Sequence, residues 1–209
     1  MSSSPSVIGA ASSASETSGR TAEQWSAKPP LSDAQVVDTR IYTDPGIFDE
    51  EVEKIWSKVW LPVCHESELP ERLDYRTSGL AGNKPIVVVR GEDNQIRTFL
   101  NICPHRNNLV VRLPAGSLKK AEPSGNANHM TCMYHGWQFN AKGQCVDIPR
   151  HAAGYQERIC KEGVGLRQIR TEVGYGGMVW VNLDDNCGSL SDFVGKSLDQ
   201  MIEQLDTEP

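Results

Sequence analysis

The chain has 209 residues, six cysteines and a formal net charge of −6, and this length is sufficient for one domain of ordinary size with a buried core. The acidic balance argues against nucleic-acid binding, which needs clustered lysine and arginine. No stretch approaches the roughly 20 apolar residues of a membrane span, and the start lacks the pattern of a secretory signal. Because the cysteines also lack the spacing of a secreted disulfide framework, we expect a cytoplasmic protein that binds neither nucleic acid nor membrane.

The first predicted element is a helix over residues 45–60. Asp44 is a good N-cap, and Pro45 suits the first helical position. Apolar residues then recur on one helical face, namely Phe48, Val52, Ile55, Trp56 and Val59. We expect Trp56 and Trp60 to be core aromatics.

Beyond this helix the sequence changes to short strands separated by turns rich in Gly and Asn. Leu73, Tyr75 and Thr77 alternate as in a half-buried strand. Further strands are expected at 85–90, 95–101, 137–139 and 178–183. Many short strands with such turns indicate a mostly β fold, an antiparallel β-sandwich or barrel with flanking N- and C-terminal helices.

Three parts follow from this pattern. Residues 1–36 are rich in Ser and Ala without apolar periodicity, which predicts a disordered leader. Residues 37–189 form the β-rich domain with its N-terminal helix. Residues 190–209 show helical spacing of apolar residues and are expected to form a C-terminal helix.

Two short loops each offer one thiolate and one imidazole, Cys103-Pro104-His105 and Cys132-Met133-Tyr134-His135. A [2Fe–2S] cluster of Rieske type takes two Cys on one iron and two His on the other. Because Cys and His lie only two or three positions apart, each loop can reach both irons. The sequence therefore predicts Cys103, His105, Cys132 and His135 as cluster ligands. A structural zinc site is the alternative, although zinc more often takes C-x₂-C or H-x₃₋₅-H pairs.

The residues around these ligands resemble the cluster loops of the large (alpha) subunit of aromatic-ring-hydroxylating Rieske oxygenases. The matching runs are 101–106 (Asn-Ile-Cys-Pro-His-Arg) and 132–139 (Cys-Met-Tyr-His-Gly-Trp-Gln-Phe), and the resemblance covers about 37–206. It implies an oxidoreductase of aromatic hydrocarbon catabolism with a Rieske-type β domain and a ferredoxin or flavin reductase as electron donor. It also implies that His135 lies at a subunit junction, where an Asp of the partner domain contacts it.

The chain departs from the family at several positions. Asn107 stands where the family usually has Gly, and Asn is the next best residue for a left-handed backbone, so the turn is expected to survive. Segment 114–128 is expected to be a surface insertion between the loops.

Three residues near the second pair of ligands also have expected roles. A side chain at Gly136 would hinder loop closure. Trp137 is expected to shield the cluster as well as fill the core, and Tyr134 either donates toward a cluster sulfur or lies on the rim.

The resemblance further implies a mononuclear Fe(II) site in a separate C-terminal domain. The motif of that site, two His five positions apart after an acidic residue, does not occur here, so we predict no catalytic residue in this chain. The chain is expected to be the N-terminal Rieske portion of an oxygenase large subunit, which passes electrons to a catalytic domain or neighbouring subunit. A stand-alone Rieske ferredoxin is the alternative. We expect no metal at His65, His129 or His151.

Overall fold

The computed structural model describes residues 39–119 and 127–195, and the chain divides into two units, Met1–Phe48 and Asp49–Pro209. The leader expected at 1–36 lies outside the described residues, as does the part of the predicted C-terminal helix beyond residue 195. Within the described ranges, no helix is long and apolar enough to cross a membrane.

The first helical region contains the 3₁₀ helix η1 (Thr39–Tyr42) followed by α2 (Pro45–Glu51). The helix α2 begins where the sequence predicted, because Asp44 caps it: the Asp44 Oδ1 accepts the backbone N–H of Gly46 at 2.8 Å.

Beyond α2 the helix continues as one π-helical segment, η2 (Val52–Trp56), and ends before Trp60. A π-helical turn contains more residues than an α-helical turn, so it rotates the side chains away from the face that a spacing of 3.6 predicts. Trp56 is 37% exposed, and the expectation that it lies in the core is wrong. Trp60 is 3% exposed as predicted, and its Nε1 donates to the Gly188 carbonyl at 3.2 Å.

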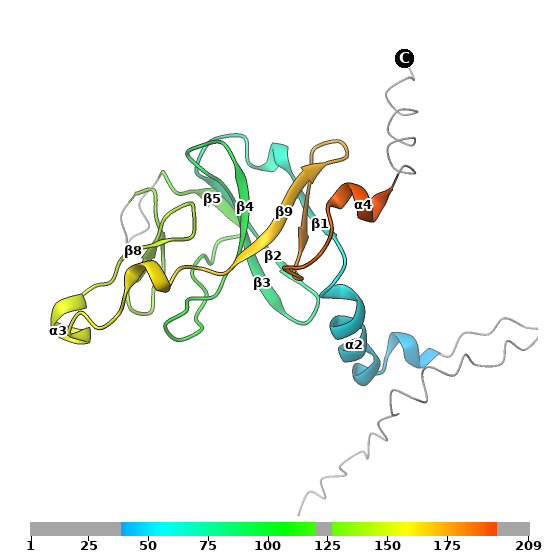
Figure 1. Ribbon diagram of the computed structural model, residues 1–209, viewed down its shortest axis with the longest axis horizontal. Helices are drawn as coiled ribbons and strands as arrows, with labels where there is room; N and C mark the ends of the chain where they lie inside the picture. Colours follow the sequence, from blue (N-terminus) through cyan, green and yellow to red (C-terminus); the bar gives the residue numbers. More distant parts are fainter. Residues whose placement is uncertain (1–38, 120–126, 196–209) are drawn as a thin grey trace, which may run out of the picture. The chain divides into compact units, whose positions relative to one another are not determined.

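The strands of the described residues form a seven-stranded sheet with the order β1-β10-β9-β4-β3-β2-β5 and a three-stranded sheet with the order β6-β7-β8. Neighbouring strands pair antiparallel throughout, and the large sheet is curled (Figure 1). The strand bounds are β1 Leu61–His65, β2 Asp74–Leu80, β3 Lys84–Arg90, β4 Ile96–Leu100, β5 Ala115–Ser117, β6 Met130–Thr131, β7 Gln138–Phe139, β8 Cys145–Asp147, β9 Gln168–Gly174 and β10 Met178–Asn182. The further helical segments are η3 Glu66–Glu68, α3 His151–Tyr155, η4 Lys161–Gly163 and α4 Leu190–Val194. The fold is mostly β and antiparallel, as the sequence predicted.

The strand β3 is buried on both faces, because each face packs against a different core cluster. Val87 and Val89 join Phe99 in the cluster that extends under the two Cys–His loops. Ile86 and Val88 point into the second cluster, on the opposite face of the sheet. Two-sided burial explains the uninterrupted apolar run of this strand.

The expected insertion between the two loops starts as part of the large sheet. Ala115–Ser117 form β5, which pairs with β2 at the sheet edge, and Leu118 is only 3% exposed. Residues 120–126 of the insertion lie outside the described residues.

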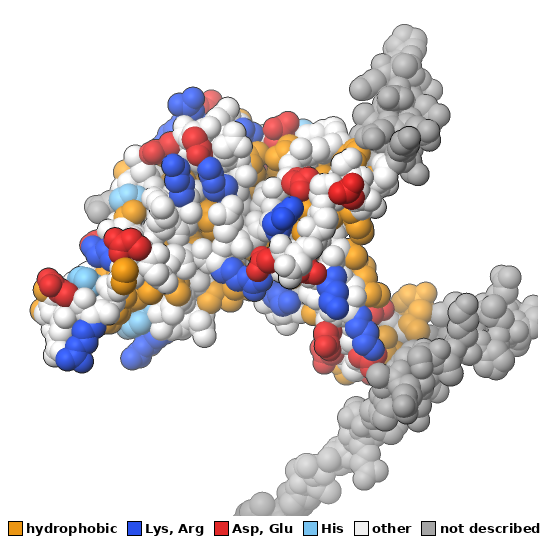
Figure 2. Space-filling model, viewed as in Figure 1, with side chains coloured by type: hydrophobic (Ala, Val, Ile, Leu, Met, Phe, Trp, Pro, Cys, Tyr) orange, Lys and Arg blue, Asp and Glu red, His pale blue; other side chains and the backbone are white. Residues whose placement is uncertain are grey.

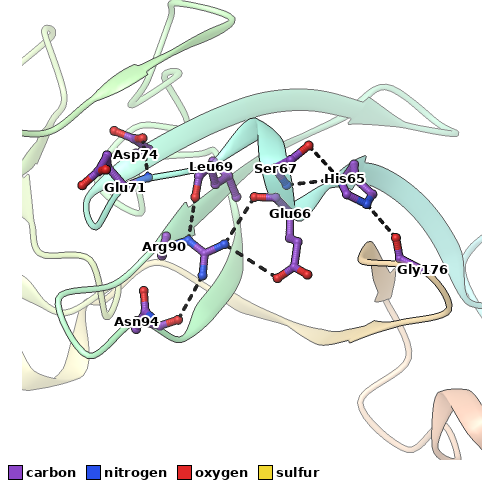
Figure 3. Close-up of polar contacts among 9 residues, drawn as sticks. All are labelled: His65, Glu66, Ser67, Leu69, Glu71, Asp74, Arg90, Asn94 and Gly176. Carbon is purple, nitrogen blue, oxygen red and sulfur yellow. Dashed lines mark hydrogen bonds and ion pairs between the residues drawn. The ribbon is translucent and has the colours of Figure 1, made fainter.

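Arg90 joins the end of β3 to the segment that contains η3 (Figure 3). Its Nε donates to the Leu69 carbonyl at 2.6 Å, and its Nη2 donates to the Glu66 carbonyl at 3.3 Å. The same Nη2 lies 3.8 Å from the Glu66 carboxylate. One guanidinium thus satisfies several acceptors of a loop that has little regular structure.

Charges of both signs are interspersed on the face shown in Figure 2. A well-aligned surface pair joins Arg97 and Asp93, whose two guanidinium–carboxylate hydrogen bonds measure 2.8 and 2.7 Å. This fork geometry lowers the pKa of Asp93 well below its usual range, mainly through hydrogen bonding to Arg97.

Candidate metal centre

The two loops that carry the Cys–His motifs have the same backbone construction. In each loop the N–H of the Cys donates to the carbonyl five residues later, and the N–H four residues later donates back to the Cys carbonyl. These bonds measure 2.8 and 2.9 Å around Cys103 and 2.9 and 2.8 Å around Cys132. The residue at the fourth position is left-handed in both loops, with φ of 54° at Asn107 and 74° at Gly136. The prediction that Asn107 preserves the turn is therefore confirmed.

The structure brings the four predicted ligands together at the tips of these loops. The rings of His105 and His135 have centroids 4.6 Å apart, and the Cys132 thiol lies close enough to Cys103 to raise its pKa. Cys103 and Cys132 are 1% and 2% exposed, whereas both imidazoles are half-buried. The sulfur donors thus lie inside the protein and the nitrogen donors toward its surface.

Burial favours the neutral forms of Cys103 and His105. Burial raises the pKa of Cys103 to about 11, and the adjacent Cys132 thiol adds to this effect, although the backbone N–H groups of His105 and Arg106 oppose it. Deprotonation of Cys103, which metal binding requires, is therefore unfavourable unless a cation compensates the charge of the thiolate. Burial lowers the pKa of His105, with contributions from His135 and Arg106. The imidazole is thereby kept in the neutral form that binds metal.

The first loop is closed at its base by a buried side chain, Asn101. Its Nδ2 donates to the Val111 carbonyl at 2.7 Å, and its Oδ1 accepts the Val111 N–H at 2.9 Å. Asn101 is 2% exposed, so water does not compete for these bonds. At the top of the loop, Asn108 Nδ2 lies 4.0 Å from the Cys132 sulfur and links the two loops. Sequence reasoning did not assign Asn101 a role, and the only signal was its position directly after β4, where the chain enters the first loop.

The second loop is held by β6, β7 and the segment after β8. A Cβ at Gly136 would lie 2.9 Å from Pro149 Cγ. The sequence suggested that a side chain at Gly136 would hinder closure of the two loops. The neighbour that such a side chain meets is instead Pro149.

Aromatic rings cover the histidine side of the site. Trp137 stacks on His105 with centroids 4.8 Å apart and an interplanar angle of 3°, and it is 3% exposed, so it both packs in the core and shields the site. Tyr155 of α3 meets His105 edge-on at 5.8 Å, and its hydroxyl lies 3.4 Å from His105 Nε2. Tyr134 lies against His135 at 4.0 Å but is 55% exposed, which places it on the rim.

The other histidines have hydrogen-bond partners elsewhere. His65 bonds the Gly176 carbonyl through Nε2 at 2.6 Å (Figure 3), and His151 Nε2 lies 2.8 Å from the Ile159 carbonyl. His129 Nδ1 lies 3.1 Å from Gln138 Oε1. All six cysteines are free.

The residues present fit a binuclear cluster. Within residues 39–119 and 127–195, no three His, Cys, Asp or Glu side chains surround a single ion position. A Rieske cluster does not need such a set, since each iron takes only two protein ligands. A pair of buried thiols beside a pair of half-buried imidazoles offers the required asymmetric donors.

Residues 59–169 match the Rieske [2Fe-2S] domain, and the chain belongs to this family. It is 55% identical over 186 residues to the methanesulfonate monooxygenase hydroxylase subunit alpha of Methylosulfonomonas methylovora, covering 89% of this chain and 45% of that protein. It is 40% identical over 190 residues to the 2-aminobenzenesulfonate 2,3-dioxygenase subunit alpha of Alcaligenes sp, covering 90% and 45%. Naphthalene 1,2-dioxygenase from Rhodococcus sp. shares the structure with a TM-score of 0.70 and 30% identity, over 82% of this chain and 37% of that one. The chain thus spans less than half the length of these relatives.

Proposed function

We propose that this chain is the electron-transfer part of the alpha subunit of a Rieske oxygenase, with Cys103, His105, Cys132 and His135 as ligands of a [2Fe–2S] cluster. The observation that carries the proposal is the convergence of two identically built loops, which present two buried thiols beside two imidazoles 4.6 Å apart. The family match and the relatives, which are oxygenase alpha subunits, support it.

When bound, the cluster accepts and passes on one electron at a time. The protein contributes exclusion of water and orientation. Cys103 and Cys132 lie in the core, and the Trp137 ring closes one side of His105. The half-buried imidazoles of His105 and His135 are the donors nearest to the surface, so they are the side from which a partner is reached.

The partners that we propose are supported by the likeness to oxygenase alpha subunits. We propose a ferredoxin or flavin reductase as electron donor and the mononuclear Fe(II) site of an oxygenase catalytic domain, in the same or a neighbouring subunit, as acceptor. We place the protein in the cytoplasm, because six unpaired cysteines fit a reducing compartment.

The substrate class that we propose is a small organosulfonate. Two relatives named for sulfonate oxidation share 55% and 40% of their aligned residues with this chain, against 30% for a naphthalene dioxygenase. In the complete oxygenase that contains this domain, methanesulfonate should stimulate NADH-dependent oxygen uptake more than naphthalene. The reverse order of substrates would contradict the proposal.

The cluster itself is tested on the purified 209-residue chain. We expect a red-brown protein with iron and acid-labile sulfide, and the His135→Ala variant should lose its visible absorption and electron paramagnetic resonance signal. His65→Ala, at an equally half-buried histidine of β1, is the matched control and should retain both. A colourless zinc protein, or an unchanged spectrum in His135→Ala, would refute the ligand assignment. A chain that carries electrons between soluble proteins without an oxygenase domain would favour the ferredoxin alternative.

A further inference from the structure

The segment between β8 and η4 places one phenol on the candidate metal centre. Tyr155 is the last residue of α3, and its hydroxyl lies 3.4 Å from His105 Nε2. Its ring stands edge-on to His105 and also to Trp137, with centroid distances of 5.8 and 6.0 Å. Tyr155 therefore fixes the plane of the imidazole from one side, while Trp137 stacks on its face.

The backbone around α3 is shaped to hold this position. Arg150 before the helix and Gln156 and Glu157 after it have φ of 58°, 52° and 55°, a region that residues with a Cβ rarely adopt. The side chain of His151 closes the segment through its 2.8 Å contact with the Ile159 carbonyl. Such a conformation at both ends of a five-residue helix persists only where surrounding contacts determine it.

The contact with Tyr155 distinguishes the two ring nitrogens of His105. Nε2 faces the phenol, which leaves Nδ1 as the nitrogen available to iron. A neutral imidazole that binds metal through Nδ1 carries its proton on Nε2. This N–H can donate to the Tyr155 oxygen, and an acceptor at that position raises the basicity of the ligating nitrogen. A more basic ligand stabilises the oxidised, more positive iron.

We propose that Tyr155 is a positioning residue that orients His105 through Nε2 and lowers the midpoint potential of the cluster. The inference rests on the proposed function, since it requires His105 to be a ligand. The contact with Tyr155 also makes the imidazoles of His105 and His135 inequivalent. Among the residues that the structure describes, none forms a hydrogen bond with the ring of His135, and the aromatic rings next to it are those of the exposed Tyr134 and of His105.

The test is a redox titration of the Tyr155→Phe variant at one fixed pH, followed by visible absorption and electron paramagnetic resonance. Phe keeps the edge-on ring and removes the oxygen. We expect the ratio of reduced to oxidised cluster at a fixed ambient potential to rise about threefold to tenfold, as for the loss of one hydrogen bond. A tenfold change corresponds to about 59 mV for one electron. The g values should shift in the same variant.

Tyr175→Phe is the matched control, because Tyr175 makes a similar edge-on contact with Trp180 outside the site and should leave the potential unchanged. Tyr155→Leu provides a second variant and should raise the potential at least as much. A cluster with an unchanged potential in Tyr155→Phe would overturn the inference, and so would a shift seen only in Tyr155→Leu, because the ring and not the oxygen would then be responsible. Absence of a cluster from the unmodified chain would instead refute the proposed function.

Discussion

The Gly136→Ala substitution, which adds one methyl group, tests how tightly the second Cys–His loop is packed. Gly136 has φ of 74°, and a Cβ there would lie 2.9 Å from Pro149 Cγ. Gly176, in the turn between β9 and β10, has the same φ of 74°, and a Cβ there would have no neighbour within 4 Å. Both substitutions force an Ala into the left-handed region, but only Gly136→Ala also meets a neighbour.

The magnitude follows from these two contributions. A residue with a Cβ loses about 1 kcal/mol in the left-handed conformation, and this cost is common to both variants. Forcing a methyl group against a ring carbon at 2.9 Å adds about 1 to 2 kcal/mol, because Pro149 is exposed and can partly move away. We therefore expect Gly176→Ala to lose about 1 kcal/mol and Gly136→Ala about 2 to 3 kcal/mol. For a chain of this size, these losses lower Tm by about 3 °C and about 5 to 10 °C, respectively.

The assay is thermal or urea unfolding of the cluster-loaded chain, with iron content measured in parallel. Gly136→Ala should also bind less iron, since the strained turn contains the ligand loop, whereas Gly176→Ala should bind the normal amount. Adding Pro149→Ala removes the opposing ring and should recover the contact energy but not the backbone energy. Equal destabilisation in the two glycine variants, or no recovery in the double variant, would refute the packing argument.

Three further outcomes are expected. The Asn101 amide now donates to the Val111 carbonyl at 2.7 Å, and Asn101→Asp replaces this donor with an oxygen. The variant should lose about 2 to 3 kcal/mol of the free energy of unfolding and bind less iron. Normal stability would contradict the role of Asn101. Arg90→Lys cannot reproduce the planar fork of donors and should cost about 1 to 2 kcal/mol in urea unfolding, with the visible spectrum unchanged. Hydrogen bonding to Arg97 lowers the pKa of Asp93, so the stability advantage over Asp93→Asn should be full above about pH 4, the pKa of an unfolded Asp, and should decline below it. A stability advantage over Asp93→Asn that increases as the pH falls would contradict this reasoning.

The parts of the fold that the sequence predicted are those set by local pattern. The strands β3, β4 and β10 appear where apolar runs end at turn residues, and the left-handed turn at Asn107 follows from the preference of Asn for that conformation. The grouping of Cys103, His105, Cys132 and His135 was also accessible, because each of the two short motifs supplies one Cys and one His, which is half of the donor set of one Rieske cluster. The assignment of these four residues as ligands stays a prediction.

The parts that the sequence did not predict depend on contacts distant in the chain. The spacing of apolar residues after Pro45 indicated one α-helix, whereas a single π-helical segment changes which side chains face inward and leaves Trp56 37% exposed. Pro149 and Tyr155 come from the segment after β8, and nothing local connects them to Gly136 or the ligand loops.

The Asn128 N–H donates to the Leu118 carbonyl at 2.5 Å, so two residues ten positions apart lie side by side between the two ligand loops. Because this bond ties the two ends of the intervening segment to each other, we expect a change in the number of residues between them to leave the two ligand loops in place. We therefore expect the length between the two Cys–His motifs to tolerate change, whereas the spacing inside each motif, whose residues lie in one hydrogen-bonded turn, should not.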